Sequence, residues 1–157
     1  MEDLIVLLGG FFLLFGLVGI VLYVLGALGL SRMAKKLGVE NPWMAWLPIF
    51  NTYLIGKIAG DEVVVFGKEV KNLAVVLAVS SVVIGAVSVI PLIGQIALIV
   101  YIIFYYTVLN KIYKIFNESS ATMYTVLSVI FAPPVFLFIM SGKEPNVSGG
   151  DNDEIEF

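Results

Sequence analysis

The chain of 157 residues contains no cysteine and no histidine. The first absence excludes disulfides and thiolate chemistry, and the second excludes imidazole metal ligands, haem ligation by histidine and histidine-based acid–base catalysis. Charged residues are also scarce, at 13% of the chain against about 25% in an average soluble domain. The formal net charge of −3 disfavours nucleic acid as a partner, because nucleic-acid binding needs a basic surface. No cofactor is expected.

Apolar residues, in contrast, make up 60% of the chain, and its mean hydropathy is +1.03. A soluble domain of this size could not hide so much apolar surface from water, so the excess is expected to face lipid. The composition predicts an all-α fold, a polytopic membrane helical bundle. Residues 1–142 are predicted to form a single transmembrane domain, and the Gly-, Ser- and acid-rich residues 143–157 a disordered tail.

Four apolar runs are candidates for membrane spans, each of which needs about 20 residues. Turn signals at 91–94 and at 117–120 separate the last three runs. Pro133-Pro134 interrupts the final run and is expected to kink its helix or end it early. The predicted spans lie near residues 4–30, 73–90, 95–114 and 121–140.

The basic residues predict how these spans are oriented, because Lys and Arg concentrate in the short cytoplasmic loops of membrane proteins. Arg32, Lys35 and Lys36 follow the first run, and Lys111 and Lys114 end the third. With four spans the two clusters fall on the same, cytoplasmic side. A multi-pass protein of the cell membrane is therefore expected, with its N- and C-termini both outside.

The segment 41–60 is predicted to lie on the membrane surface or to re-enter the membrane, in preference to forming a fifth span. Trp43, Trp46, Leu47 and Phe50 recur at helical spacing, which is typical of a helix at the lipid boundary. Asn51 is expected to cap a second short helix over 52–58. Together with the cations Arg32, Lys35 and Lys36, the tryptophans Trp43 and Trp46 form a candidate site for lipid headgroups.

The same segment carries a motif, W-x4-P-I-x-N-x-Y, formed by Trp43, Pro48, Ile49, Asn51 and Tyr53. It resembles a pattern in uncharacterised small multi-span membrane proteins of bacteria, where it follows a first transmembrane helix and a short basic loop. The resemblance covers roughly residues 20 to 60. It implies membrane localisation and no particular activity.

Small residues form two stripes, one with a seven-residue repeat in the first run and one with alternating spacings of four and three in the second. Such stripes let membrane helices approach closely. Packing within the bundle is the preferred interpretation, and a homo-oligomer interface is the alternative. The stripes consist of Gly9, Gly16, Gly19 and Gly26 in the first run, and of Ala74, Ala78, Ser81, Gly85 and Ser88 in the second.

These observations favour a non-enzymatic membrane protein: an accessory subunit, a scaffold or a lipid-interacting protein. Its expected partners are membrane lipids, a second copy of itself or another membrane protein. The alternative is an oligomeric channel or small-solute permeation protein with its path along the serine stripe, although charged residues are absent from the middle of the spans. A polar pocket of Tyr105, Asn110 and Gln95 is not expected, because Gln95 lies too far along the helix from Asn110.

Overall fold

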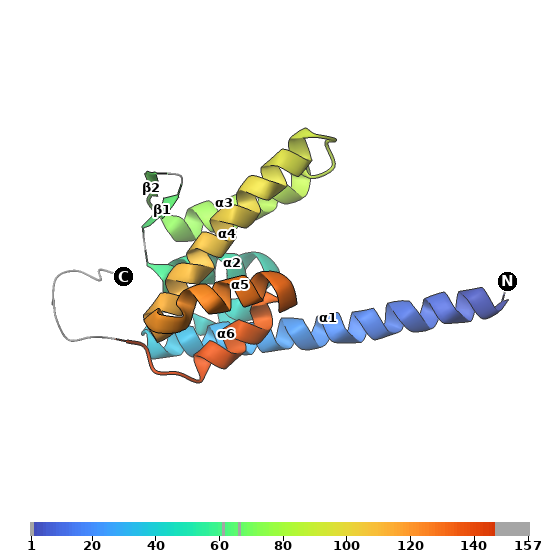
Figure 1. The fold of residues 1–157 in the computed structure, drawn as a ribbon, viewed down its shortest axis with the longest axis horizontal. Helices are drawn as coiled ribbons and strands as arrows, with labels where there is room; N and C mark the ends of the chain where they lie inside the picture. Colours follow the sequence, from blue (N-terminus) through green and yellow to red (C-terminus); the bar gives the residue numbers. More distant parts are fainter. Residues whose placement is uncertain (1, 61, 66, 147–157) are drawn as a thin grey trace.

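The computed structural model describes residues 2–60, 62–65 and 67–146, and the chain is mostly helical (Figure 1). The predicted disordered tail lies outside the described residues from position 147 onward. The elements are α1 (Glu2–Lys36), η1 (Pro42–Trp46), α2 (Pro48–Ala59), β1 (Val63–Val65), β2 (Lys68–Val70), α3 (Leu73–Val87), α4 (Ile93–Asn117), η2 (Glu118–Ser120), α5 (Ala121–Phe131) and α6 (Pro133–Ser141).

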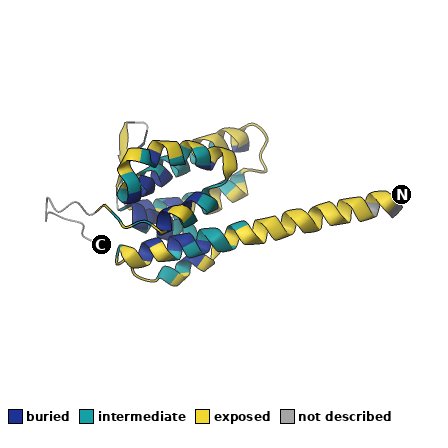
Figure 2. Ribbon diagram, turned by 60° about the horizontal axis from the view of Figure 1, so that its bottom comes forward, coloured by how far each residue is buried: buried dark blue, intermediate teal, exposed yellow. Residues whose placement is uncertain are grey.

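Helix α1 is the longest element, with 35 residues and a length of about 52 Å. Its N-terminal half stands apart from the other helices, and the side chains described between positions 3 and 20 are all exposed (Figure 2). Its C-terminal half packs against α6, η1 and α2. Gly38, with φ +69°, ends the helix, and Val39 N–H donates to the Ala34 carbonyl, as in a glycine-terminated helix.

The remaining helices form three hairpins: η1 with α2, α3 with α4, and α5 with α6 (Figure 1). In each hairpin the turn that joins the two helices, which we call the inner turn, contains a proline and no charged residue. Pro48 begins α2, Pro91 lies between α3 and α4, and Pro133-Pro134 begins α6. A proline at the start of a helix has no N–H to leave without an acceptor.

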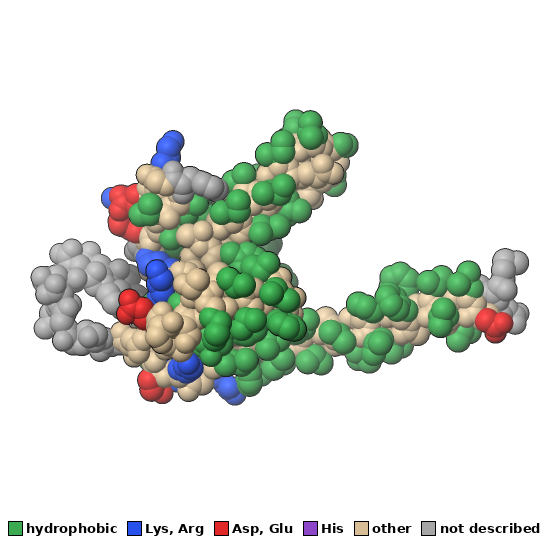
Figure 3. Space-filling view, viewed as in Figure 1, with side chains coloured by type: hydrophobic (Ala, Val, Ile, Leu, Met, Phe, Trp, Pro, Cys, Tyr) green, Lys and Arg blue, Asp and Glu red, His purple; other side chains and the backbone are tan. Residues whose placement is uncertain are grey.

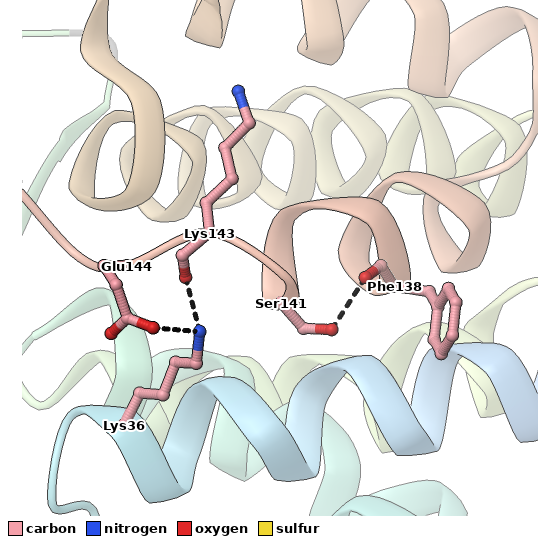
Figure 4. A network of polar contacts seen from close by, with 5 residues as sticks. All are labelled: Lys36, Phe138, Ser141, Lys143 and Glu144. Atoms are coloured by element: carbon pink, nitrogen blue, oxygen red, sulfur yellow. Dashed lines mark hydrogen bonds and ion pairs between the residues drawn. The ribbon is translucent and has the colours of Figure 1, made fainter.

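The outer ends of the hairpins meet at the end of the molecule that carries Lys36, Lys111 and Lys143, which we call the basic end. On the face in Figure 3, the Lys and Arg side chains lie toward this end. The two-stranded antiparallel hairpin β1–β2 lies there too (Figure 1). Lys36 Nζ donates to the Lys143 carbonyl at 2.7 Å and pairs with Glu144 at 3.0 Å (Figure 4).

The structure differs from the predicted fourth span, because residues 121–140 do not form one helix. Helix α5 ends at Phe131, Ala132 has φ 131°, and α6 then runs back beside α1. Both ends of the α5–α6 hairpin therefore lie at the basic end, where Asn146 N–H donates to the Ile115 carbonyl at 2.7 Å. The prolines have no N–H with which to continue helix α5, and after them α6 packs closely against α1.

Two stretches are long and apolar enough to cross a membrane by length and composition, Val6–Lys36 and Ile93–Phe131. The second is not straight. The chain reverses at Asn117 (φ −163°, ψ 86°), so that α5 runs antiparallel to α4 and Asn110 contacts Thr125. The four predicted spans are thus not reproduced as four long helices among the described residues.

Glycines bring the helix backbones close at two contacts. A Cβ atom on Gly29 would lie 2.7 Å from the Leu137 backbone of α6. A Cβ on Gly56 of α2 would lie 2.3 Å from Ala74 Cα of α3. Real Cβ atoms do not approach backbone so closely, so any larger residue at either position must push the two helices apart.

Replacing Gly56 by alanine therefore tests the α2–α3 contact. We expect Gly56→Ala to lower the free energy of unfolding by about 1–3 kcal/mol, the usual cost of overpacking. The matched control is Gly85→Ala on α3, where a Cβ meets nothing within 4 Å and alanine improves helix propensity. Unfolding in mixed detergent measures both, and equal stability of the two variants would contradict the packing described.

Candidate functional site

The predicted headgroup residues do not form one cluster. Arg32 lies 5.0 Å from the ring centroid of Phe138, and Lys36 is engaged by Glu144. The Trp46 carbonyl accepts a hydrogen bond from Tyr23, which precedes Lys36 by about 20 Å along α1. Residues 41–60 therefore leave the basic end, turn back at Pro48 and return to it.

The motif residues build this turn. Pro48 occupies the first position of α2, and Asn51 N–H donates to the Leu47 carbonyl at 2.7 Å. Asn51 thus lies inside the first turn of α2. The prediction that it caps a helix starting at residue 52 is wrong. Tyr53 is half-buried, while Trp43 and Trp46 are exposed. Gly60, with φ +84°, ends α2 at the basic end.

The two small-residue stripes have mixed surroundings. A Cβ on Gly26 would touch the Pro134 side chain at 3.1 Å, and Ser81 lies 3.3 Å from Thr52. Ala78 is half-buried, and Ser88 donates to the Gly85 carbonyl of its own helix. Ala74 packs on Gly56, whereas a Cβ would meet nothing within 4 Å at Gly9, Gly16, Gly19 and Gly85.

A hollow at the basic end lies between the β1–β2 hairpin and α4. Its volume is about 360 Å³. One wall comes from the strand pair and the other from one face of α4, where four residues follow the i, i+3, i+4, i+7 spacing of a helix face. The lining residues are Glu62, Val63, Val64 and Glu69 on the first wall, and Thr107, Asn110, Lys111 and Lys114 on the second.

The helix wall bears two lysines, and the strand wall bears two glutamates with Lys71 beside one of them. Lys71 Nζ lies 3.6 Å from the Glu62 carboxylate, and Lys111 donates to the Glu62 carbonyl. The hydrogen bond with Glu69, followed by the charge of Lys71, lowers the pKa of Glu62. The hydrogen bond and charge of Glu62 raise the pKa of Glu69. The strand wall therefore has mixed charge, with Lys71 offsetting part of the negative charge of Glu62 and Glu69.

An apolar groove of about 450 Å³ lies beside the hollow, between α4 and α5. Thr107 and Asn110 line both, so the two spaces adjoin at these residues. Asn110 Nδ2 donates to Thr125 Oγ1 at 2.9 Å, joining the groove's walls. Its other lining residues are Ile102, Ile103, Tyr106, Thr122, Val126 and Val129.

The sequence did not predict this site, because its two walls are separated by about 40 residues of chain. Asn110 does line a hollow, but with Thr107 and Thr125 in place of the rejected partner Gln95. The available signal was the polar face of α4 beside the basic end. Among the described residues, no group of three or more acidic side chains could hold a metal ion.

No protein-family model, curated protein or solved structure matches the chain. The site must therefore be interpreted from its own geometry: a hollow with charged walls and, adjoining it, an apolar groove.

The Asn110–Thr125 hydrogen bond is expected to hold the groove's shape. Thr125→Val keeps the volume but leaves the Asn110 amide without this acceptor, at a cost of about 1 kcal/mol in the free energy of unfolding. Thr122→Val, in the exposed part of the same wall, is the control and should be neutral. Unfolding in detergent compares the two variants. If Thr125→Val leaves the free energy of unfolding unchanged, the Asn110–Thr125 hydrogen bond does not stabilise the groove.

Proposed function

We propose that this chain is a non-enzymatic integral membrane protein that binds membrane lipid in the hollow and groove beside α4. In the proposed arrangement α1 crosses the membrane, and the three helical hairpins enter from the side of the basic end without crossing.

Helix lengths support this arrangement. The hydrocarbon core of a bilayer is about 30 Å thick, and α1 exceeds it even when tilted. Helix α3 has 15 residues, or about 22 Å, and α5 and α6 have 11 and 9 residues. Helix α4 is longer, but its part before Lys111 has 18 residues, or about 27 Å, so the turn of this hairpin still falls short of the opposite surface.

The turn between α3 and α4 is suited to an environment without water. Its side chains Val89, Leu92 and Ile93 are apolar and 79%, 68% and 61% exposed. Its backbone is hydrogen-bonded internally, since the N–H groups of residues 88, 90, 93 and 94 donate to carbonyls of the same hairpin. Lipid supplies no hydrogen-bond partners, so a turn inside it must provide its own.

The charge distribution supports a cytoplasmic basic end. With one crossing, Asp3 at the start of α1 then faces the outside. Lys143 and Glu144, held beside Lys36, face the cytoplasm. This replaces the expectation that both termini lie outside, which depended on a fourth span over 121–140.

The observation that carries the lipid-binding proposal is that the charged hollow and the apolar groove adjoin at Thr107 and Asn110. The hollow lies at the level of Lys111 and Lys114, and the groove extends toward the inner turns between Ile103 and Val126. A membrane lipid has the same order, with a polar headgroup above an acyl chain. Lysines near the membrane surface also attract lipid phosphates.

Single-cysteine variants test the topology cleanly, because the chain has no cysteine of its own. In oriented vesicles, a membrane-impermeant maleimide should label Lys68→Cys and Glu144→Cys from one side and Asp3→Cys from the other. Leu92→Cys should stay unlabelled until detergent is added, because its turn lies within the membrane. Labelling of Glu144→Cys from the side of Asp3→Cys would instead support four spans.

Filling the groove tests lipid binding. Val126→Trp places an indole where the acyl chain would lie, and should remove most of the lipid that stays bound in native mass spectrometry after mild extraction. Val75→Trp on α3 is the control, because its site lies outside the groove and its exposure of 53% matches the 55% of Val126. Equal lipid retention by the two variants would place the bound lipid elsewhere.

A further inference from the structure

The groove between α4 and α5 is polar at the end nearest the basic end and apolar at the other. This order bears on the kind of lipid that it accepts, an inference that rests on the lipid binding proposed above. Two hydrogen bonds set the register of the helices: Asn110 Nδ2 donates to Thr125 Oγ1 at 2.9 Å, and the Tyr106 hydroxyl donates to the Ser128 carbonyl at 3.1 Å. From the basic end inward, the groove is therefore lined first by Asn110, Thr122 and Thr125 and last by Ile102, Ile103 and Val129.

Two hydrogen-bond donors at the polar end of the groove have no acceptor within the part of the chain that the structure describes. The Thr125 hydroxyl gives its proton to the Ala121 carbonyl at 2.9 Å, so its oxygen accepts from Asn110. An asparagine amide has two N–H donors, and this hydrogen bond occupies one of them. The second N–H of Asn110 and the hydroxyl of Thr122, which is exposed in the groove, are both available to a ligand.

The other hydroxyls of the groove offer no proton to a ligand. Thr107 Oγ1 donates to the Ile103 carbonyl at 2.8 Å, and the Tyr106 hydroxyl donates to the Ser128 carbonyl. A hydroxyl has a single proton, so these two groups can act toward a ligand only as acceptors. Among the described lining residues, the available donors are therefore confined to the polar end of the groove.

These donors lie at the level where a bound lipid has its acyl linkages. Lys114, exposed at the basic end, follows Asn110 by about one turn of α4, or about 6 Å. A lysine at the membrane surface attracts lipid phosphates. In a diacyl glycerophospholipid the ester carbonyls lie between the phosphate and the hydrocarbon, and a carbonyl oxygen accepts hydrogen bonds without donating any. A phosphate near Lys114 therefore brings an ester carbonyl to the two donors and directs its acyl chain toward Ile102 and Ile103.

We propose that the groove selects ester-linked glycerophospholipids, with one ester carbonyl accepting hydrogen bonds from Asn110 Nδ2 and the Thr122 hydroxyl. In an ether-linked lipid a methylene group replaces this carbonyl, and both donors lose their acceptor. A site that hydrogen-bonds one ligand discriminates against its analogue through the polar groups that are left unpaired. The headgroup takes no part in this selection.

The experiment offers the protein equal amounts of dioleoyl phosphatidylcholine and its dioleyl diether analogue in nanodiscs. The two lipids have the same headgroup, chain length and double bonds, and native mass spectrometry separates them by mass after transfer to detergent. We expect the ester-linked lipid to be enriched by about fivefold among the lipids retained. This is the effect of one ordinary hydrogen bond, since water at the membrane surface competes for the same donors.

Substitutions at Thr122 test the assignment of the donors. Thr122→Val keeps the shape of the side chain and removes its donor, so it should reduce the enrichment toward parity. Because the Thr122 hydroxyl makes no hydrogen bond among the described residues, this variant should fold as the wild type does. Thr122→Ser keeps a hydroxyl and should retain the enrichment. Thr52→Val makes the same substitution on α2, outside the groove, and should leave the enrichment unaltered.

The outcomes separate this inference from the proposed function. Equal retention of the two lipids, with loss of both in Val126→Trp, would overturn the selection for the ester linkage and leave lipid binding in place. An ester preference of unchanged size in Thr122→Val would also overturn the selection, because the donors would then lie elsewhere. Absence of retained lipid in the wild-type protein would overturn both proposals.

Discussion

Backbone hydrogen bonding at the inner turns is the constraint on which the rest of the proposed arrangement depends. A helical hairpin can end inside a membrane only if its turn leaves few polar groups without partners. Prolines at positions 48, 91, 133 and 134 remove N–H donors at these turns, and the turn at 88–94 satisfies much of its backbone internally. In the proposed arrangement, this internal hydrogen bonding allows the α3–α4 hairpin to end inside the membrane and return to the basic end.

This return brings together residues that are distant in the chain. The β1–β2 hairpin and the C-terminal half of α4 meet at the basic end, and α5 lies beside α4 because the chain reverses at Asn117. The result is a hollow with charged walls that adjoins an apolar groove. Helix α1 contributes to neither wall. Gly26 and Gly29 let its second half pack closely against α6, and its first half stands apart from the other helices.

Much of the fold could be predicted from the sequence, because charge and turn residues mark the ends of its helices. The breaks after Lys36, at Pro91 and at Asn117 follow from local chemistry. The reversal at Ala132 does not follow from local chemistry, because a proline pair is compatible with either a kink or a turn. Its choice depends on α6 meeting glycines of α1 about 100 residues earlier. The hollow and the groove were missed for the same reason: their walls adjoin only after the hairpins have folded.

The depth of the α3–α4 turn tests the central claim most directly. A nitroxide attached to Val89→Cys in liposomes reports collisions with oxygen, which concentrates in the hydrocarbon, and with a water-soluble nickel complex. The account predicts high oxygen and low nickel accessibility at position 89, and the reverse for the same label at Lys68→Cys. Nickel accessibility at position 89 equal to that at position 68 would contradict the account, because the turn would then lie in water.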